Sequence, residues 1–414
     1  MTAVVATEVS PSAPAAAPGG RFAALDGLRA LAALAVVATH AGFQTGRSLD
    51  DGPAAPFLAR LDFGVTVFFL LSGFLLYRPW ALAALEGRPG PSVRGYARRR
   101  AVRILPAYWL VIVVTLALAT DEPHGPVDWV RYLTLTQSYA GPRIDPMLTQ
   151  MWSLVVEVAF YVVLPLLAAL AARRGGGVRR QMGVLAGLVV AALAWQALAT
   201  AGVVPREPAR GWLPAFLDWF ALGMGLALAH AALTRRGAAA PRRLRTLLEV
   251  AAAPGTCWVV AGLLFWLATT PIAGPRSLVP PTGWEWAAKH WLYGLAATFL
   301  LLPAVLGPAD SPLCQVLGSR PMRWLGEVSY GVFLWHLTLL MLLRQALGMT
   351  LFSGSFLLLY ATTVPLSLAV AALSYHQLER PLMRRARGGR EPAGHQESAS
   401  SAPTTTPTAS AQPS

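Results

Sequence analysis

The sequence has few charged residues, a single lysine and two cysteines. Only 13% of its 414 residues are charged, whereas soluble globular proteins contain about 25%, so an ordinary soluble domain is excluded. Lys289 is the one lysine, and the net charge of +14 therefore comes from arginine. Cys257 and Cys314 show no metal-ligand spacing and are not expected to pair. The sequence predicts neither a metal site nor a disulfide framework.

What the chain has instead is apolar segments. Hydrophobic residues make up 55% of the chain, and the mean hydropathy is +0.49. They fall in runs of about 16 to 22 residues, the length that crosses a bilayer core. This pattern predicts an all-α, polytopic membrane protein of about ten transmembrane helices. The predicted spans lie near residues 24–44, 63–81, 104–120, 150–171, 183–201, 212–230, 255–270, 288–307, 326–344 and 355–377.

The arginines are distributed unevenly between the two sides of the predicted bundle. If the N-terminus is cytoplasmic, the loops and tail on that side hold 22 arginines and the opposite loops hold 8. Because arginine and lysine accumulate in cytoplasmic loops, the excess predicts that both termini are cytoplasmic and that the protein lies in the plasma membrane. The net charge is thereby explained without a nucleic-acid partner.

The two ends of the chain are expected to be disordered tails around one membrane domain. Residues 1–20 are rich in Ala, Pro and Ser and lack the basic region of a signal peptide. Residues 386–414 are rich in Gly, Ser, Thr, Pro and Gln. Residues 21–385 form the predicted transmembrane domain, with no sizeable soluble domain beside it.

Arg29 and His40 are ionisable residues inside the first predicted span. They are 11 residues apart, about 20° past three full turns, so both project from one helix face with a rise of roughly 16 Å between them. Ionisable groups in membrane helices are costly and usually mark a functional site. The alternative is an interfacial arginine and a hydrogen-bonded core histidine.

Glu157 lies about two turns inside the fourth predicted span. A carboxylate at that depth is either protonated or paired, which favours a functional or structural pairing role. In the second span, Ser72 and Gly73 form a small patch that allows close approach of a ligand or, by the alternative interpretation, of another helix.

Arg100 and Arg103 form an i, i+3 pair at the cytoplasmic mouth of the third span. Such a pair suits bidentate contacts to phosphate. The alternative is a cluster that binds the head groups of anionic membrane lipids.

Further polar residues lie within the last spans or near span ends. His336 falls near mid-membrane, where it is either catalytic or a neutral ring bonded to a neighbouring helix. Glu379 lies at the cytoplasmic interface and is expected to pair with other charges there. Four others are interpreted as interfacial, namely Asp218, His230, Lys289 and His290.

Six short motifs follow one another along residues 21–385. Together they resemble the acyltransferase-3 family of integral membrane acyltransferases, which includes O-acetylases of bacterial surface polysaccharides and 3-O-acyltransferases of macrolides. The motifs are Leu-Asp-Gly-Leu-Arg-x10-His (25–40), Phe-Phe-x-x-Ser-Gly-Phe (68–74), Arg-x-x-Arg-x-x-Pro (100–106), Trp-Ser-Leu-x-x-Glu-x-x-Phe-Tyr (152–161), Ser-Tyr-Gly-x-x-x-Trp-His (329–336) and Glu-Arg-Pro (379–381).

The resemblance implies transfer of an acyl group from a cytoplasmic acyl-CoA, of which acetyl-CoA is the first candidate. The expected acceptor is a hydroxyl of a carbohydrate, a glycolipid or a macrolide. No permanently bound cofactor is expected. The family's essential histidine corresponds to His40, its first-helix arginine to Arg29 and its Arg-x-x-Arg pair to Arg100 and Arg103. Many relatives carry a further hydrolase-like domain. This chain resembles the stand-alone type, for which direct delivery of the acyl group is expected. Direct delivery suits a small acceptor, such as a macrolide or a sugar lipid, although stand-alone relatives also modify polymers.

The topology and the resemblance suggest a mechanism. Acyl-CoA phosphates would dock on Arg100 and Arg103, and the thioester arm would follow the Arg29 face to His40, the general base. Glu157, expected in the same layer as His40, would orient the imidazole or hold the acceptor. Candidate oxyanion donors are Ser72, Ser153 and Tyr161. Within this mechanism, an acyl-histidine intermediate is less favoured than direct transfer. Two other functions are alternatives to an enzyme: a proton-coupled transporter that uses the buried His, Glu and Arg residues, and a structural membrane subunit.

Overall fold

The structure, a computed structural model, describes residues 22–118, 124–139, 145–239, 241–276 and 279–388, and these ranges contain helices and no strand. The predicted tails at 1–20 and from 389 onward lie outside the described residues. Residues 386–388, which the sequence assigns to the C-terminal tail, belong to helix α16 (Arg380–Gly388). The all-α prediction is confirmed for the described part of the chain.

The expected number of spans is confirmed as well. Within the described ranges nine helices are long and apolar enough to cross a membrane. A pair bent by 83°, α10 (Arg242–Ala251) with α11 (Pro254–Ala268), brings the number to ten when it is counted as one span. The third span begins earlier than predicted, so the arginine cluster 98–103 is helical. The other long helices are α1 (Ala23–Gln44), α3 (Phe63–Leu85), α4 (Val93–Leu118), α6 (Met151–Ala172), α7 (Val178–Thr200), α9 (Leu217–Arg236), α12 (Gly283–Leu306), α14 (Arg320–Ala346) and α15 (Phe356–Ser374).

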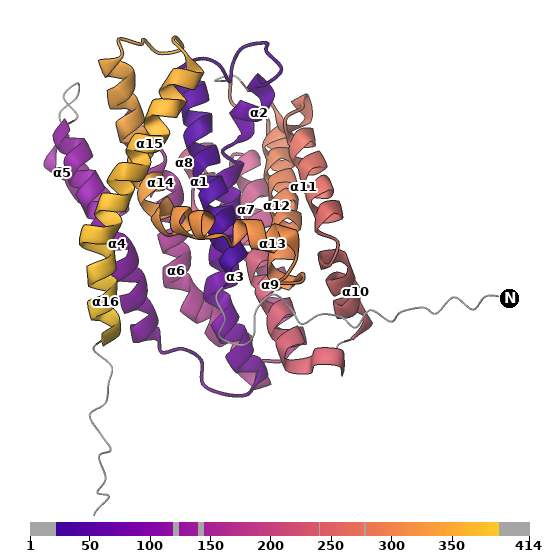
Figure 1. Cartoon of the computed structure of the whole chain (residues 1–414). Helices are drawn as coiled ribbons and strands as arrows, with labels where there is room; N and C mark the ends of the chain where they lie inside the picture. Colours follow the sequence, from indigo (N-terminus) through magenta and orange to yellow (C-terminus); the bar gives the residue numbers. More distant parts are fainter. Residues whose placement is uncertain (1–21, 119–123, 140–144, 240, 277–278, 389–414) are drawn as a thin grey trace, which may run out of the picture.

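The bundle has two ends, which are useful for locating the site. One end, which we call the arginine-rich end, holds α10, α16 and the first turns of α1 and α4; α10 and α16 lie toward the bottom of Figure 1. The opposite end, which we call the far end, holds α2 (Ala55–Arg60) and the start of α3, with α2 at the top of the same view. Short helices connect the spans, namely α5 (Pro126–Leu133), α8 (Arg206–Ala209) and α13 (Pro312–Leu317).

Helix α1 lies in the middle of the bundle because its neighbours come close to its backbone. A Cβ atom on Gly27 would collide with the carbonyl oxygen of Leu317, and one on Gly326 would collide with that of Asp26. On another side, Gly64 of α3 meets Ala32 in the same way. The glycine of the Leu-Asp-Gly-Leu-Arg motif is therefore a packing residue that fixes α1 two residues before Arg29.

Helices α3 and α9 form the most extensive pair in the described structure. Gly73 of α3 packs on the backbone of Phe220, and Gly223 of α9 packs on the backbone of Leu70. The small patch at residues 72 and 73 thus serves helix packing through Gly73, which leaves Ser72 on a different face of the helix.

We predict that Gly223→Ala destabilises the protein by about 1–3 kcal/mol, because the added methyl group pushes two helix backbones apart. Gly262→Ala in α11 is the matched control, since nothing lies within 4 Å of its Cβ position and alanine is the better helix former. Thermal unfolding of the two purified variants in the same detergent measures the difference. Equal melting temperatures for both variants would show that the crossing is looser than described.

Candidate active site

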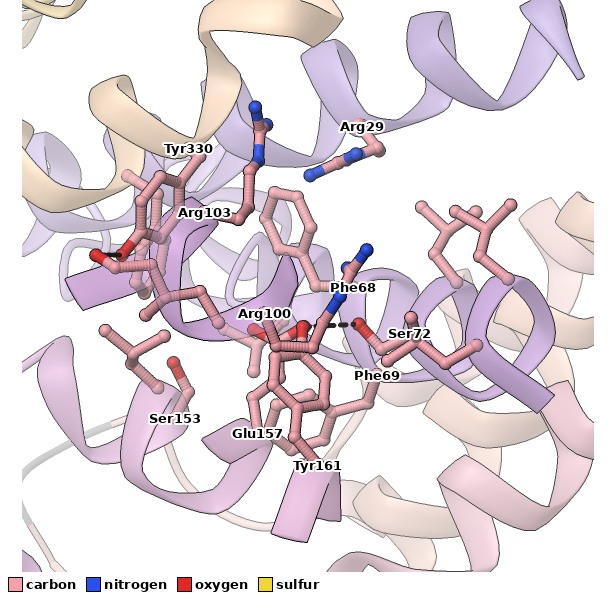
Figure 2. A pocket seen from close by; sticks show the side chains of 17 residues that line it. Arg29, Phe68, Phe69, Ser72, Arg100, Arg103, Ser153, Glu157, Tyr161 and Tyr330 are labelled. Carbon is pink, nitrogen blue, oxygen red and sulfur yellow. Dashed lines mark hydrogen bonds between the residues drawn. The ribbon is translucent and has the colours of Figure 1, made fainter. Parts of the chain in front are cut away.

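A small cavity of about 100 Å³ lies between α1, α3, α4, α6 and α14. We call it the arginine pocket, and Figure 2 shows Arg29, Arg100 and Arg103 lying around the ring of Phe68 within it. Seven of the ten site residues that the sequence predicts line this one cavity, although they come from four separate helices. They are Arg29, Ser72, Arg100, Arg103, Ser153, Glu157 and Tyr161.

Glu157 is the hydrogen-bond acceptor at the centre of the pocket. The hydroxyl of Tyr161 donates to Glu157 Oε1 at 2.5 Å, and the hydroxyl of Ser72 donates to the same oxygen. The charge of Arg29 also interacts with this carboxylate. The sequence predicts a carboxylate that is either protonated or paired, and in the structure Glu157 accepts hydrogen bonds from two hydroxyl groups.

The three hydroxyl groups predicted as oxyanion donors are already engaged. Those of Ser72 and Tyr161 donate to Glu157, and that of Ser153 donates to the carbonyl of Gln150 at 3.1 Å. By contrast, no hydrogen bond of Arg29 or Arg100 to another described residue is found. The free N–H groups of the pocket therefore belong to its arginines.

A larger cavity of about 580 Å³ continues from the arginine pocket toward the arginine-rich end, and we call it the arginine vestibule. Arg29, Arg100 and Arg103 line both cavities, and Arg99 joins them in the vestibule. The carboxylates in its wall are those of Asp26 and Glu327. Guanidinium groups present planar forks of donors that match phosphate oxygens, so this excess of arginine suits a phosphorylated ligand.

Arg103 and Glu379 are held at the edge of the vestibule. Arg103 lies over the ring of Tyr330 at 5.9 Å. Glu379 closes a π-helical turn, Tyr375–Glu379, and is 1% exposed. It is therefore buried within the bundle. Its charge interacts with that of Arg103, and the Ser374 hydroxyl also acts on its carboxylate.

His40 and His336 lie together outside the arginine pocket. Their ring centroids are 5.2 Å apart, and the ring of Phe333, which lines the pocket, is 5.9 Å from that of His336. His336 Nδ1 lies 2.8 Å from the carbonyl oxygen of Phe333. Because a carbonyl only accepts, Nδ1 carries the proton, and Nε2 is left as a lone-pair acceptor with no partner among the described residues.

The prediction that Glu157 and His40 share a layer is wrong, because Glu157 lies in the layer of Arg29. The amide of Gln150 donates to the carbonyl of Leu334 at 3.1 Å, which sets the start of α6 level with Leu334. Glu157, seven residues further along α6, lies roughly 10 Å closer to the arginine-rich end. Counting turns from the predicted span end failed because α6 begins deep inside the bundle, where Met151 is fully buried.

Several ionisable residues near the predicted span ends are buried and have partners within the bundle. Asp218 and His290 are 5% and 4% exposed, and His290 Nε2 lies 2.9 Å from Asp218 Oδ2. His230 is 1% exposed and accepts a hydrogen bond from Arg78 Nε at 3.3 Å. A partner that lies in another helix leaves no mark in the local sequence, so both contacts were missed.

Asp62 is the carboxylate that sequence reasoning did not single out. Lys289 Nζ lies 2.6 Å from Asp62 Oδ2, and the charge of Asp62 interacts with the imidazole of His40. An aspartate directly before a helix is an ordinary capping residue, which is why its sequence position drew no attention.

Comparisons with known proteins agree with this geometry. The model of the acyltransferase-3 family, described as an acyltransferase domain, matches residues 22–376. The chain is 24% identical over 378 residues to "Peptidoglycan O-acetyltransferase OatA" of Listeria monocytogenes, covering 87% of this chain and 55% of OatA. It is 26% identical to "Exopolysaccharide production protein ExoZ" of Rhizobium meliloti, covering 86% and 97% of the two chains.

A third relative is "Acyltransferase MdmB" of Streptomyces mycarofaciens, 34% identical over 262 residues that cover 58% of this chain and 65% of MdmB. The chain thus spans about half the length of OatA. No solved structure matches it. Because the family model covers nearly the whole described bundle, the chain belongs to the acyltransferase-3 family.

Proposed function

We propose that this protein is a plasma-membrane O-acyltransferase that moves an acetyl or other short acyl group from acyl-CoA to a hydroxyl of a carbohydrate, glycolipid or macrolide acceptor. The observation that carries the proposal is the convergence of Arg29, Arg100 and Arg103 on two connected cavities, all three lining both. A relative named as a peptidoglycan O-acetyltransferase and one named for exopolysaccharide production support a carbohydrate acceptor.

The proposed orientation puts the arginine-rich end and both termini in the cytoplasm, where acyl-CoA is available. The excess of arginine on that side supports it. The phosphates of acyl-CoA bind in the vestibule on Arg100 and Arg103, with Arg29 next along the path. The thioester arm then passes Phe68 and Phe333 toward His40, roughly 16 Å from Arg29 along α1.

The chemical step is a direct transfer. His40 takes the proton of the acceptor hydroxyl as that oxygen attacks the thioester carbonyl. The C–S bond then breaks, the thiolate leaves with the proton from His40, and the new ester remains on the acceptor. The Nε2 lone pair of His336 supports this step by accepting a hydrogen bond beside His40. Glu157 acts as a positioning residue that holds Ser72 and Tyr161 and partly balances the arginines, rather than as a partner of His40.

We predict that His40→Ala lowers the rate of transfer by a factor of about 10² to 10⁴, the usual contribution of a general base. The exposed residue His376 lines neither cavity, and His376→Ala is the matched control with an unchanged rate. The measurement is release of free CoA from acetyl-CoA by protein in liposomes, with a mixture of methyl glycosides and a macrolide as acceptors. A transporter would release no CoA. If the His40→Ala variant released CoA at an unchanged rate, His40 would be excluded as the general base.

We predict that Arg100→Ala and Arg103→Ala each raise the KM for acetyl-CoA by about 10- to 100-fold, because a hydrogen bond to a charged group is worth about 1.5–3 kcal/mol. Arg98→Ala is the control, since Arg98 is exposed on the same helix and lines neither cavity. The KM for the acceptor should stay constant in all three variants. Docking of phosphates on this pair is refuted if the Arg98 variant changes the KM for acetyl-CoA as much as the other two.

A further inference from the structure

A third cavity, of about 340 Å³, opens at the far end of the bundle. It is formed by α2, the N-terminal parts of α3, α6, α9 and α12, and the segment between α11 and α12, from which Ala273, Pro275, Arg276, Val279 and Pro281 line it. Its volume falls in the range of about 300–1,000 Å³ that is usual for small-molecule sites. We call it the aromatic pocket after the rings in its wall, which are those of Trp152, Phe216, Trp219, Trp286 and Tyr293.

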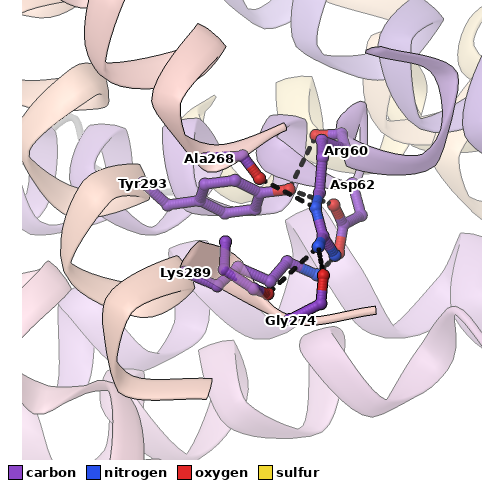
Figure 3. A network of polar contacts seen from close by, with 7 residues as sticks. Arg60, Asp62, Ala268, Gly274, Lys289 and Tyr293 are labelled. Atoms are coloured by element: carbon purple, nitrogen blue, oxygen red, sulfur yellow. Dashed lines mark hydrogen bonds and ion pairs between the residues drawn. The ribbon is translucent and has the colours of Figure 1, made fainter. Parts of the chain in front are cut away.

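An ion pair faces this cavity. Lys289 Nζ lies 2.6 Å from Asp62 Oδ2, and the hydroxyl of Tyr293 donates to Asp62 Oδ1 at 2.6 Å (Figure 3). The side chains of Asp62 and Lys289 are 42% and 25% exposed, so both keep free hydrogen-bonding positions toward the pocket.

The other charges of the aromatic pocket are already neutralised or engaged. Arg60 donates to three carbonyl oxygens, those of Ala268 at 3.0 Å, Ala273 at 3.0 Å and Gly274 at 2.6 Å, and Figure 3 shows its guanidinium among them. His290 is bonded to Asp218. Arg276, the other arginine in the wall, donates to the carbonyl oxygen of Asp50 at 3.1 Å. Both arginines of this cavity are thus bonded to backbone carbonyls, and the cavity suits a neutral polar ligand better than the vestibule does.

The floor of the aromatic pocket holds a hydroxyl group without a partner. Thr66 is 0% exposed, lines the cavity, and its Oγ1 has no hydrogen-bond partner among the described residues. A threonine within a helix commonly donates to the carbonyl four residues earlier, and Thr66 does not. A buried hydroxyl left unpaired costs about 1–3 kcal/mol, which a ligand hydroxyl at this position would relieve.

The aromatic pocket and the arginine pocket adjoin one another along α3. Val65 lines both. Phe69 lines the arginine pocket, and its ring packs on Phe216 at 5.5 Å and on Trp219 at 6.1 Å, which line the aromatic pocket. An aromatic wall thus separates the two cavities.

We propose that the aromatic pocket is the acceptor subsite and binds one neutral sugar ring of the acceptor. A sugar offers both surfaces that the pocket requires, an apolar C–H face for aromatic rings and hydroxyls for Asp62, Lys289 and Thr66. A lipid chain would leave the ion pair unused, and a phosphate would meet the carboxylate of Asp62. The identity of the ligand as acceptor rests on the proposed function, whereas sugar binding does not.

The first experiment measures binding alone. Methyl glycosides of glucose, galactose, mannose and N-acetylglucosamine are tested by saturation-transfer NMR with the full-length protein in nanodiscs. At least one should bind, with the strongest transfer to its ring C–H protons, and Thr66→Phe, which fills the cavity, should abolish the signal. Absence of binding by all four glycosides, or binding unaffected by Thr66→Phe, overturns the proposal.

The second experiment uses a substitution that keeps the shape of the side chain. Thr66→Val should weaken binding of the best glycoside, and raise its KM as acceptor, by about 2- to 12-fold, the loss of one hydrogen bond. Thr363→Val is the matched control, because Thr363 is also 0% exposed with an unpartnered hydroxyl but lines none of the three cavities. The KM for acetyl-CoA should not change in either variant. An equal effect of both substitutions would refute a contact at Thr66.

The two proposals fail in different ways. If a glycoside binds in a Thr66-dependent manner but no CoA is released, the proposed function fails and the sugar site stands. If CoA is released in a manner that depends on His40 and Arg100 while Thr66→Val leaves the acceptor KM unchanged, the acceptor subsite fails and the proposed function stands.

Discussion

The constraint on which the site depends is the presence of three arginines and one carboxylate in a cavity inside an apolar bundle. An arginine at the centre of a membrane helix costs about 2.5–3.5 kcal/mol even on the most favourable scale. Glu157 balances at most one of the positive charges of Arg29, Arg100 and Arg103, and two hydroxyls already donate to its Oε1. Glu379 interacts with Arg103, and Asp26 and Glu327 line the vestibule, where four arginines face these two carboxylates. The arginines remain in excess in the vestibule, and an anionic ligand there would reduce that excess.

The packing of α1 makes this arrangement rigid. Gly27, Gly64 and Gly326 each bring a backbone into contact with another backbone, so α1 is fixed from several sides near Arg29. Because Arg29 and His40 share that helix, their separation is fixed as well. The distance from Arg29 in the arginine pocket to His40 is thus set by one helix and not by mobile loops. Only a ligand with a long arm is able to reach from the arginines to the pair of His40 and His336.

The sequence predicted well what depends on local pattern. Apolar runs of membrane length located the nine long apolar helices and the bent pair of α10 and α11, and costly polar residues within them identified seven side chains that share the arginine pocket. The sequence-based prediction failed where a residue's environment depends on the depth of its helix in the bundle or on a partner in a neighbouring helix. Glu157 was placed one layer too high because α6 begins inside the bundle, and His290 was judged interfacial because its partner Asp218 lies in another helix. Asp62 and Thr66 looked ordinary because only the fold brings a cavity to them.

The separation of the cavities bears on how an acyl group would cross the membrane. The phosphate-suited vestibule and the neutral aromatic pocket lie toward opposite ends, divided by Phe69 and the rings that pack on it. Moving a phosphorylated carrier past this wall would require desolvating its charges, whereas an acyl group and its uncharged arm carry no such cost. In the proposed reaction the charged part of the donor therefore stays in the vestibule, the sugar stays at the far end, and only the acyl group passes between them beside His40.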